Sequence, residues 1–335
     1  MIVEQGSVRI DLLGGTLDIH PINLVLPNAY TLNLATSLKA RVELKEINFP
    51  GIRFITKDYG QTKEFKTTEL TNANLATALF GNFNFFVRIL LLFEVKKNLE
   101  ITLSSGSPPG AGLGGSSAMG ITFYKAILKL LKIEEDKDSI IRKVKDVEAI
   151  LLDSGQTGYQ DYYPALYGGV LALIPTVGGI KVSQLYSDKL KKEIEERMTL
   201  VFTGEMRFSG LNNWEVYKGF FNKNPAIRTG LANIAQYAKE AYDAITLKDW
   251  NAFFELIKKE GEEREKLFPQ IVVDSQRKLL GEIRKEIKDV GMKVCGAGGG
   301  GCFILIHKND EYPIIEKLVR SSTMSILDFT VEKPI

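Results

Sequence analysis

The sequence predicts an α+β protein with two domains. Its 335 residues exceed the size at which a single hydrophobic core usually stops growing. The first half mixes alternating strands with helices, and the second half opens with a strand, continues with helices and closes with strands, which is an α+β order. A polar, glycine-containing stretch at 177–186 separates the halves. We therefore expect domains at 1–182 and 183–335.

Strands open the first half. Residues 7–13 and 38–47 alternate apolar and polar side chains, as half-buried strands do. The apolar window 83–95 is short and contains Arg88 and Glu94, so it predicts a buried helix rather than a membrane span.

Helices dominate the middle and the second half. Ile121, Tyr124, Leu128 and Leu131 recur at three- and four-residue steps, which indicates one buried helix face. A turn-rich stretch at 153–161 follows a second helix. The other expected elements are helices at 137–152, 224–245, 247–266, 275–290 and 311–321, and strands at 169–174, 198–203, 292–295 and 302–307, with one more strand near the end.

Charge and composition argue against several classes of partner. The chain has 43 Lys and Arg against 41 Asp and Glu, so no net field favours nucleic acid or an anionic membrane. The first residues lack the basic and apolar run of a signal peptide. Two cysteines, Cys295 and Cys302, are too few for a disulfide framework. We expect a cytoplasmic enzyme with no nucleic-acid or membrane partner.

A glycine-rich loop between a strand and a helix is the strongest functional signal. It reads Pro108-Pro-Gly-Ala-Gly-Leu-Gly-Gly-Ser-Ser-Ala118. Such a loop collects N–H groups at a helix N-terminus, where the helix dipole favours anions. Glycines let the backbone approach a ligand closely, and Ser116 and Ser117 can cap the helix or reach a metal-bound phosphate. The loop predicts phosphate binding.

Residues 110–115 also match the dinucleotide motif G-x-G-x-x-G. That motif requires the loop directly after a strand and a second strand with an acidic residue further on. Here Ser-Gly-Ser-Pro-Pro precedes the loop and the chain leads into another helix, so an oxidoreductase is the weaker interpretation. No Gly-Lys-Ser/Thr is present for a P-loop.

A second loop, 296–301, has five glycines in six residues and a strand on each side. A dinucleotide motif would continue into a helix instead. Because glycine loses the most entropy on ordering, close approach to a ligand explains this composition better than a simple turn.

Three segments together resemble the GHMP kinase superfamily. They are the stretch 7–22, the loop 108–118 and the stretch 293–302, in the family's order. The pattern Arg9-x-Asp11-x-x-Gly14-Gly15-x-x-Asp18 is similar to the sugar-kinase branch, which includes fucokinases, heptose 7-phosphate kinases and galactokinases. The segments 158–169 and 203–209 are similar to that branch as well, whereas Thr16-Leu17 departs from it.

The resemblance implies a two-domain GHMP kinase fold. Its N-terminal domain would be like ribosomal protein S5 domain 2, and its C-terminal domain would be ferredoxin-like. The implied cofactors are ATP and Mg²⁺. The residues expected to bind ATP are Pro108, Gly110, Ala111, Gly112, Leu113, Gly114, Gly115, Ser116 and Ser117.

The resemblance also implies catalytic roles. Asp161 would take the proton of the attacking hydroxyl, and Arg9 would support the transferred phosphoryl group or keep Asp161 ionised. Ser116 and Glu148 would hold Mg²⁺, which prefers hard oxygen ligands. The acceptor would contact Asp18, His20, Gly298 and Gly299.

These features predict an ATP-dependent kinase acting on a hydroxyl of a sugar or sugar phosphate, with the anomeric hydroxyl as one candidate. The alternatives are a mevalonate- or homoserine-type acceptor, the dinucleotide-dependent oxidoreductase, and an ATP-binding protein without catalysis. A small-molecule sugar and ATP are the expected partners of a monomer or homodimer. The sequence does not fix the sugar.

Overall fold

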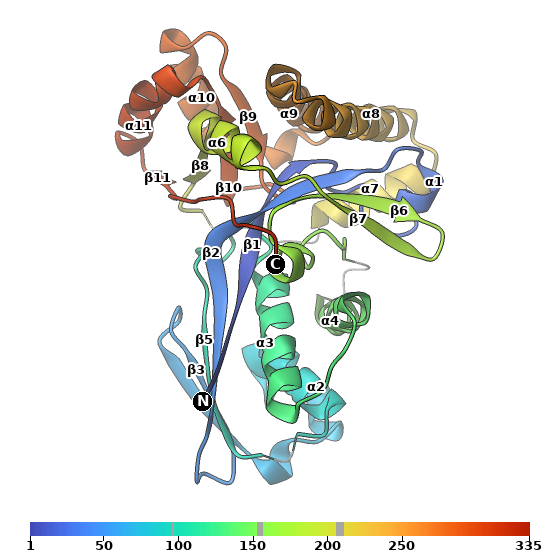
Figure 1. Ribbon diagram of the computed structural model, residues 1–335, viewed down its shortest axis with the longest axis vertical. Helices are drawn as coiled ribbons and strands as arrows, with labels where there is room; N and C mark the ends of the chain where they lie inside the picture. Colours follow the sequence, from blue (N-terminus) through green and yellow to red (C-terminus); the bar gives the residue numbers. More distant parts are fainter. Residues whose placement is uncertain (96, 153–156, 206–210) are drawn as a thin grey trace. The chain divides into compact units, whose positions relative to one another are not determined.

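The computed structural model describes residues 1–95, 97–152, 157–205 and 211–335 (Figure 1). They form two compact units that interleave along the chain. The first unit contains Met1–Val8, Leu38–Pro108 and Gly114–Leu166, and the second contains Arg9–Ser37, Pro109–Leu113 and Tyr167–Ile335. The chain passes between the units within its two longest strands, β1 (Ile2–Leu13) and β2 (Thr31–Glu46).

In the first unit, a sheet is accompanied by three helices. The sheet order is β4 (Gln61–Lys66), β3 (Gly51–Thr56), β5 (Leu99–Ser104) and then the end of β2, with only the β3–β5 pair parallel. The helices α2 (Asn84–Leu92), α3 (Gly115–Leu131) and α4 (Lys137–Leu152) contact one another. They meet at Gly120, where a Cβ would lie 2.4 Å from the Phe85 ring and 2.8 Å from Val144.

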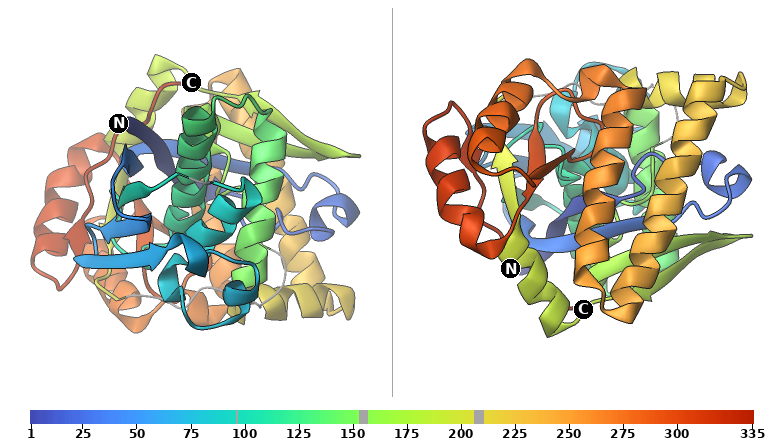
Figure 2. Two further views of the ribbon diagram at one scale, coloured as in Figure 1. Left: turned by 90° about the horizontal axis from the view of Figure 1, so that it is seen from below. Right: turned by 90° about the horizontal axis from the view of Figure 1, so that it is seen from above.

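The second unit contains an antiparallel sheet in the order β11 (Ser325–Ile326), β8 (Met198–Phe202), β10 (Cys302–Ile306) and β9 (Gly291–Val294). The long helices α8 (Pro225–Leu247) and α9 (Trp250–Leu267) lie side by side (Figure 1 and Figure 2). Its core joins Val201 and Phe303 of the sheet to Leu231 of α8 and Ile283. The remaining elements of this unit are α1 (Ile22–Val25), α6 (Asp188–Arg197), α7 (Leu211–Phe221), α10 (Asp274–Glu286) and α11 (Tyr312–Arg320), and the hairpin β6 (Val170–Thr176) and β7 (Gly179–Gln184) that pairs with the start of β2. The short helix α5 (Pro164–Tyr167) lies where the chain enters it.

Most expected elements are confirmed within a few residues, as is the α+β class. Helix α10 ends at Glu286 rather than 290, because Ile287 is extended. Helix α7 was not predicted. The stretch 177–186 contains β7, which pairs with β6, so the domain boundary at 182/183 falls within a strand and stays a prediction.

Two of the segments singled out in the sequence are only partly visible. Residues 153–156 of the turn-rich stretch and 206–209 of the similar segment at 203–209 lie outside the described residues. Among the helices that the structure describes, none is long and apolar enough to cross a membrane.

Candidate active site

The first glycine loop is fixed by its carbonyl oxygens. Gly110 and Gly112 have φ of +70° and +79°, a region that glycine enters without strain. Arg9, buried on β1, donates from Nη1 to the oxygen of Gly112, and its backbone N–H donates to Leu113 at 2.9 Å. These bonds use the carbonyl oxygens of the loop and not its N–H groups, which suits a loop that binds anions.

The second glycine loop packs directly on the first. The N–H of Cys302 donates to the oxygen of Ala111 at 2.6 Å. Gly301 has φ of +72°, and a Cβ there would lie 2.8 Å from the oxygens of both Gly110 and Ala111. The two loops, far apart in the sequence, therefore share one backbone contact that only glycine permits at position 301.

Substituting Gly301 should test that contact. We expect Gly301→Ala to weaken ATP·Mg²⁺ binding by roughly tenfold or more, because a left-handed alanine costs about 1–2 kcal/mol and its Cβ would displace the first loop. Isothermal titration measures the affinity. Gly281→Ala is the control, since its Cβ would meet nothing within 4 Å. Unchanged ATP affinity in Gly301→Ala would show that the contact between the two loops does not contribute to ATP binding.

A buried carboxylate, Glu148 of α4, lies in the first unit close to the start of α3. Its Oε2 accepts hydrogen bonds from the hydroxyls of Ser117 and Tyr162, both at 2.7 Å. Burial raises the pKa of Glu148; hydrogen bonds from Tyr162, Ser117 and Ser116 lower it, the charge of Asp161 raises it, and the net pKa is raised. The five residues of this cluster come from α3, α4 and the chain before α5.

This cluster fits a magnesium ion. Its donors are hydroxyl and carboxylate oxygens, and the second negative charge, of Asp161, disfavours ionised Glu148; a divalent cation would offset that repulsion. No group of three or more His, Cys, Asp or Glu arranged for a metal occurs in the described part of the chain. Mg²⁺ needs fewer protein ligands, because it keeps several waters and binds phosphates.

A second buried cluster consists of four charged side chains of the second unit. No role was predicted for any of them from the sequence, and only Asp11 and Lys293 lie in the segments that resemble the family. Lys293 Nζ lies 3.2 Å from Asp11 Oδ2 and 3.5 Å from Glu260 Oε2. Arg264 Nε lies 3.3 Å from Glu260 Oε1, and its Nη1 lies 3.7 Å from Asp11 Oδ2. All four residues are at most 3% exposed.

Close packing of α9 on β9 creates this cluster. A Cβ at Gly261 would lie 2.3 Å from the oxygen of Met292, so glycine allows the helix to approach the strand. Burial raises the pKa of Asp11, but the charges of Lys293, Arg264 and Arg9 outweigh it and the net pKa is lowered. Burial raises the pKa of Glu260, and despite both cations it stays above its usual value.

The predicted acceptor residues belong to the second unit, as this cluster does. Asp18 is buried and His20 is exposed. Gly299 donates its N–H to Ile271 at 2.7 Å, and Gly298 packs on the same residue. The first unit contains the predicted catalytic and metal-binding residues Asp161, Ser116 and Glu148. That they act together with the acceptor residues of the second unit stays a prediction.

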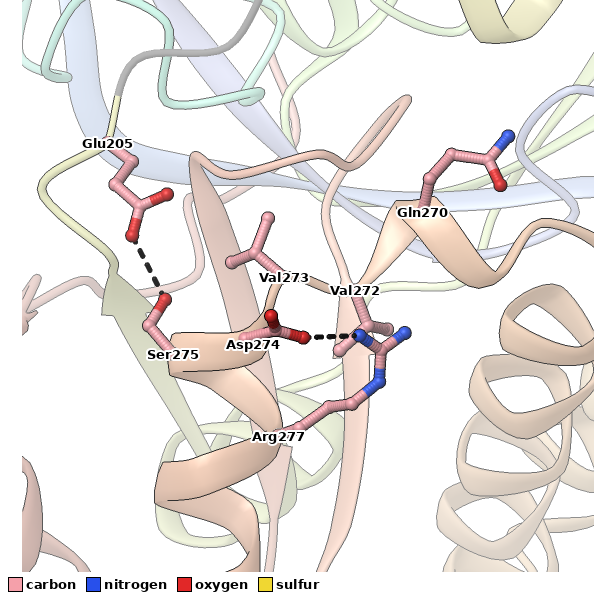
Figure 3. A pocket seen from close by; sticks show the side chains of 7 residues that line it. All are labelled: Glu205, Gln270, Val272, Val273, Asp274, Ser275 and Arg277. Atoms are coloured by element: carbon pink, nitrogen blue, oxygen red, sulfur yellow. Dashed lines mark hydrogen bonds and ion pairs between the residues drawn. The ribbon is translucent and has the colours of Figure 1, made fainter.

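An open depression of about 450 Å³ lies beside the second glycine loop (Figure 3). Four of its polar side chains pair with one another: Ser275 donates to Glu205 at 3.0 Å, and Arg277 donates to Asp274 at 3.2 Å. This pairing gives no sign of a ligand there. The lining residues are Glu205, Gln270, Val272, Val273, Asp274, Ser275 and Arg277.

The dinucleotide interpretation lacks its structural unit. Helix α3, which begins after the loop, is followed by α4 and not by a strand. A dinucleotide site requires a βαβ unit at this position, so the motif match at 110–115 carries no support from the fold.

The chain forms two interleaved α+β units and has two glycine loops in backbone contact, and comparison with known proteins identifies the family. The family model described as "GHMP kinases N terminal domain" matches residues 84–169, and the model described as "GHMP kinases C terminal" matches residues 241–321. The chain belongs to the GHMP kinases, whose two-domain fold it has.

Individual relatives support this family. The chain is 25% identical to the bifunctional fucokinase/GDP-fucose pyrophosphorylase of Arabidopsis thaliana, over 91% of the chain and 30% of that protein. It spans about a third of the length of the fucokinase relatives that it matches. It is 25% identical to D-glycero-alpha-D-manno-heptose 7-phosphate kinase of Campylobacter jejuni, over 99% of the chain and 97% of that protein. A mevalonate kinase crystal structure has the same fold, with TM-score 0.78 at 19% identity, covering 99% of this chain and 100% of that one.

Proposed function

We propose that this protein is an ATP-dependent kinase that transfers phosphate to a hydroxyl of a sugar or sugar phosphate. The observation that carries the proposal is the backbone contact between the two glycine loops, with Arg9 bonded to Gly112. It supports a rigid loop whose N–H groups, together with the N-terminus of α3, hold a polyphosphate.

Magnesium, when bound, offsets the negative charge of the phosphates. Ser116 and Glu148 would hold it, with Ser117 and Tyr162 orienting the Glu148 carboxylate through their hydrogen bonds. Asp161 would accept the proton of the attacking hydroxyl. Arg9 would hold the first glycine loop in place through its bond to Gly112. We also propose that Arg9 contacts the transferred phosphoryl group.

A sugar is the favoured acceptor because relatives that match over most of this chain are a fucokinase and a heptose 7-phosphate kinase. The test is ADP release with ATP·Mg²⁺ and fucose, galactose, glucuronate, galacturonate, mannose or heptose phosphates as acceptors. Turnover of one sugar well above the water-only background supports the proposal. No turnover with any of them would reject a sugar substrate.

Mevalonate is the second candidate acceptor, because a mevalonate kinase of Thermococcus sibiricus is 22% identical over 89% of this chain. Adding mevalonate and homoserine to the same panel decides between the acceptors. Titration with NAD in place of ATP tests the oxidoreductase alternative, and we expect no binding.

Asp18→Ala should harm acceptor binding selectively. Asp18 is 2% exposed and follows β1 in the acceptor motif. Losing charge-assisted hydrogen bonds to sugar hydroxyls should raise the acceptor KM by roughly tenfold or more, with ATP affinity unchanged. Steady-state kinetics give the KM. The control, Asp274→Ala, removes an exposed carboxylate of the same unit, and an unchanged acceptor KM in Asp18→Ala would exclude Asp18 from the site.

A further inference from the structure

Thr16 has a backbone conformation that its side chain disfavours. Its φ is +75°, and a β-branched residue in the left-handed region is an outlier. Such residues persist only where surrounding contacts hold them. The turn containing Thr16 has weak internal hydrogen bonds, from Leu17 to Gly14 at 3.2 Å and from Ile19 to Thr16 at 3.4 Å. Contacts from elsewhere must therefore stabilise it.

Arg264 of α9 provides such a contact and connects the turn to the second glycine loop. Its Nη2 donates to Thr16 Oγ1 at 2.8 Å, and its Nη1 donates to the oxygen of Gly296 at 3.1 Å. The guanidinium lies directly against the turn, because a Cβ at Gly15 would be 3.0 Å from Nη2 and 2.2 Å from Asp11 Oδ2. A single planar group thus bonds two loops far apart in the sequence.

Glu260 and Asp11 hold the guanidinium in this orientation from two other sides, with the ion pairs described above. All three guanidinium nitrogens of Arg264 already contact protein oxygens, of Glu260, Gly296 and Thr16, so we place Arg264 behind the acceptor site and not in contact with the acceptor. A lysine could not replace it, because an ammonium is a point charge, whereas the rigid fork of arginine reaches two acceptors with fixed geometry.

We propose that Arg264 is a positioning residue for the acceptor site. It fixes the turn 14–18, which carries Asp18, and the start of the second glycine loop at Gly296 in one arrangement. The kinetic consequence rests on the proposed function, because it requires that Asp18 contacts the acceptor. The structural consequence does not, since it concerns only the order of the two loops.

Hydrogen exchange of the ligand-free protein tests the structural consequence. Arg264→Lys should raise exchange about tenfold, through local opening, in peptides covering both 14–19 and 296–301. Thr16→Val has nearly the same shape without the hydroxyl, and should raise exchange in 14–19 only. Thr16→Ser restores the hydroxyl and should restore protection. Arg320→Lys, at an exposed position of α11 paired with Glu316, is the control for the same substitution elsewhere.

Kinetics with the panel sugar of highest turnover test the second consequence. Both Arg264→Lys and Thr16→Val should raise the sugar KM by roughly tenfold with little change in the ATP KM. The two effects on the sugar KM should not add in the double variant, because both substitutions break the same hydrogen bond, from Arg264 to Thr16. If Arg264→Lys fails to fold, the Thr16→Val and Thr16→Ser pair decides.

The possible results are distinguishable. Absence of turnover with every sugar would remove the proposed function and leave the exchange experiment valid. Unchanged exchange in 14–19 for Arg264→Lys, or equal exchange in Thr16→Val and Thr16→Ser, would overturn the positioning role. A uniform rise in exchange over the whole second unit would also overturn it, because that result indicates a merely structural role.

Discussion

Asp161→Asn is expected to lose phosphoryl transfer by about 10²-fold or more, the range for removing a general base, while the protein still binds ATP. The amide has the same shape as the carboxylate but accepts no proton from the attacking hydroxyl. Asp161 is half-buried in the first unit, next to Tyr162, which bonds Glu148. Steady-state turnover with the preferred acceptor and titration with ATP·Mg²⁺ are the two measurements.

The pKa of Glu148 makes this test sharper. The charge of Asp161 contributes to raising that pKa, so Asp161→Asn should lower it and leave Glu148 more fully ionised at neutral pH. Because the substitution also removes a negative charge that would attract the cation, titration with Mg²⁺ alongside the turnover assay separates a lost general base from a lost metal. Asp146→Asn, at an exposed position of α4, is the matched control. Full turnover in Asp161→Asn would mean that another group accepts the proton of the attacking hydroxyl.

Local sequence patterns predicted the loops but not their partners. Residues 110–117 are recognisable because glycines and hydroxyls stand next to a helix start. Ser117 does not cap that helix, because Gly114 occupies the N-cap position, and the Ser117 hydroxyl donates to Glu148. Its contact with a metal-bound phosphate stays a prediction. The bond from Ser117 to Glu148 depends on how α3 packs on α4, and the packing depends on Gly120. No short-range pattern encodes such a contact.

The buried charges of Glu260, Arg264 and Lys293 were not predicted, because the residues next to Glu260 and Arg264 in the sequence are typical of a solvent-exposed helix. Residues 258–266 read Lys-Lys-Glu-Gly-Glu-Glu-Arg-Glu-Lys, which is typical of an exposed helix face. Only Gly261 within that run signals close packing, since glycine is unfavourable in a helix interior. Lys293 gives a similar signal, because it lies in a short strand between the apolar residues Met292 and Val294. Tertiary contacts alone reveal that these charges are buried together.

Lys293→Met is expected to lower the free energy of unfolding by about 3–5 kcal/mol, the range for removing one partner of a buried ion pair. Methionine fills nearly the same volume, so the loss would come from charge rather than from a cavity. The ammonium bonds the oxygen of Asp11 and pairs with two carboxylates. Urea unfolding of the full chain measures the change. Lys285→Met, which removes an exposed pair on α10, should change stability by at most about 1 kcal/mol.

The loss should depend on pH with a definite sign. Lys293 is the largest charge that lowers the pKa of Glu260, so its removal should raise that already elevated pKa further. A folded-state pKa above the unfolded value stabilises the protein at low pH, and this contribution disappears as pH rises through the folded pKa. The lowered pKa of Asp11 has the opposite effect in the unsubstituted protein, whose stability falls on acidification.

In acid, the raised pKa of Glu260 stabilises Lys293→Met, and the lowered pKa of Asp11 destabilises the unsubstituted protein. Acidification therefore reduces the difference in unfolding free energy between the variant and the unsubstituted protein. The deficit of Lys293→Met should therefore be smaller near about pH 5 than near about pH 8, because protonated Glu260 no longer needs a cation. An exposed or water-filled cluster would instead give a small deficit at both pH values. A deficit that grows on acidification would contradict the raised pKa of Glu260, and with it the burial of two carboxylates against Arg264 and Lys293.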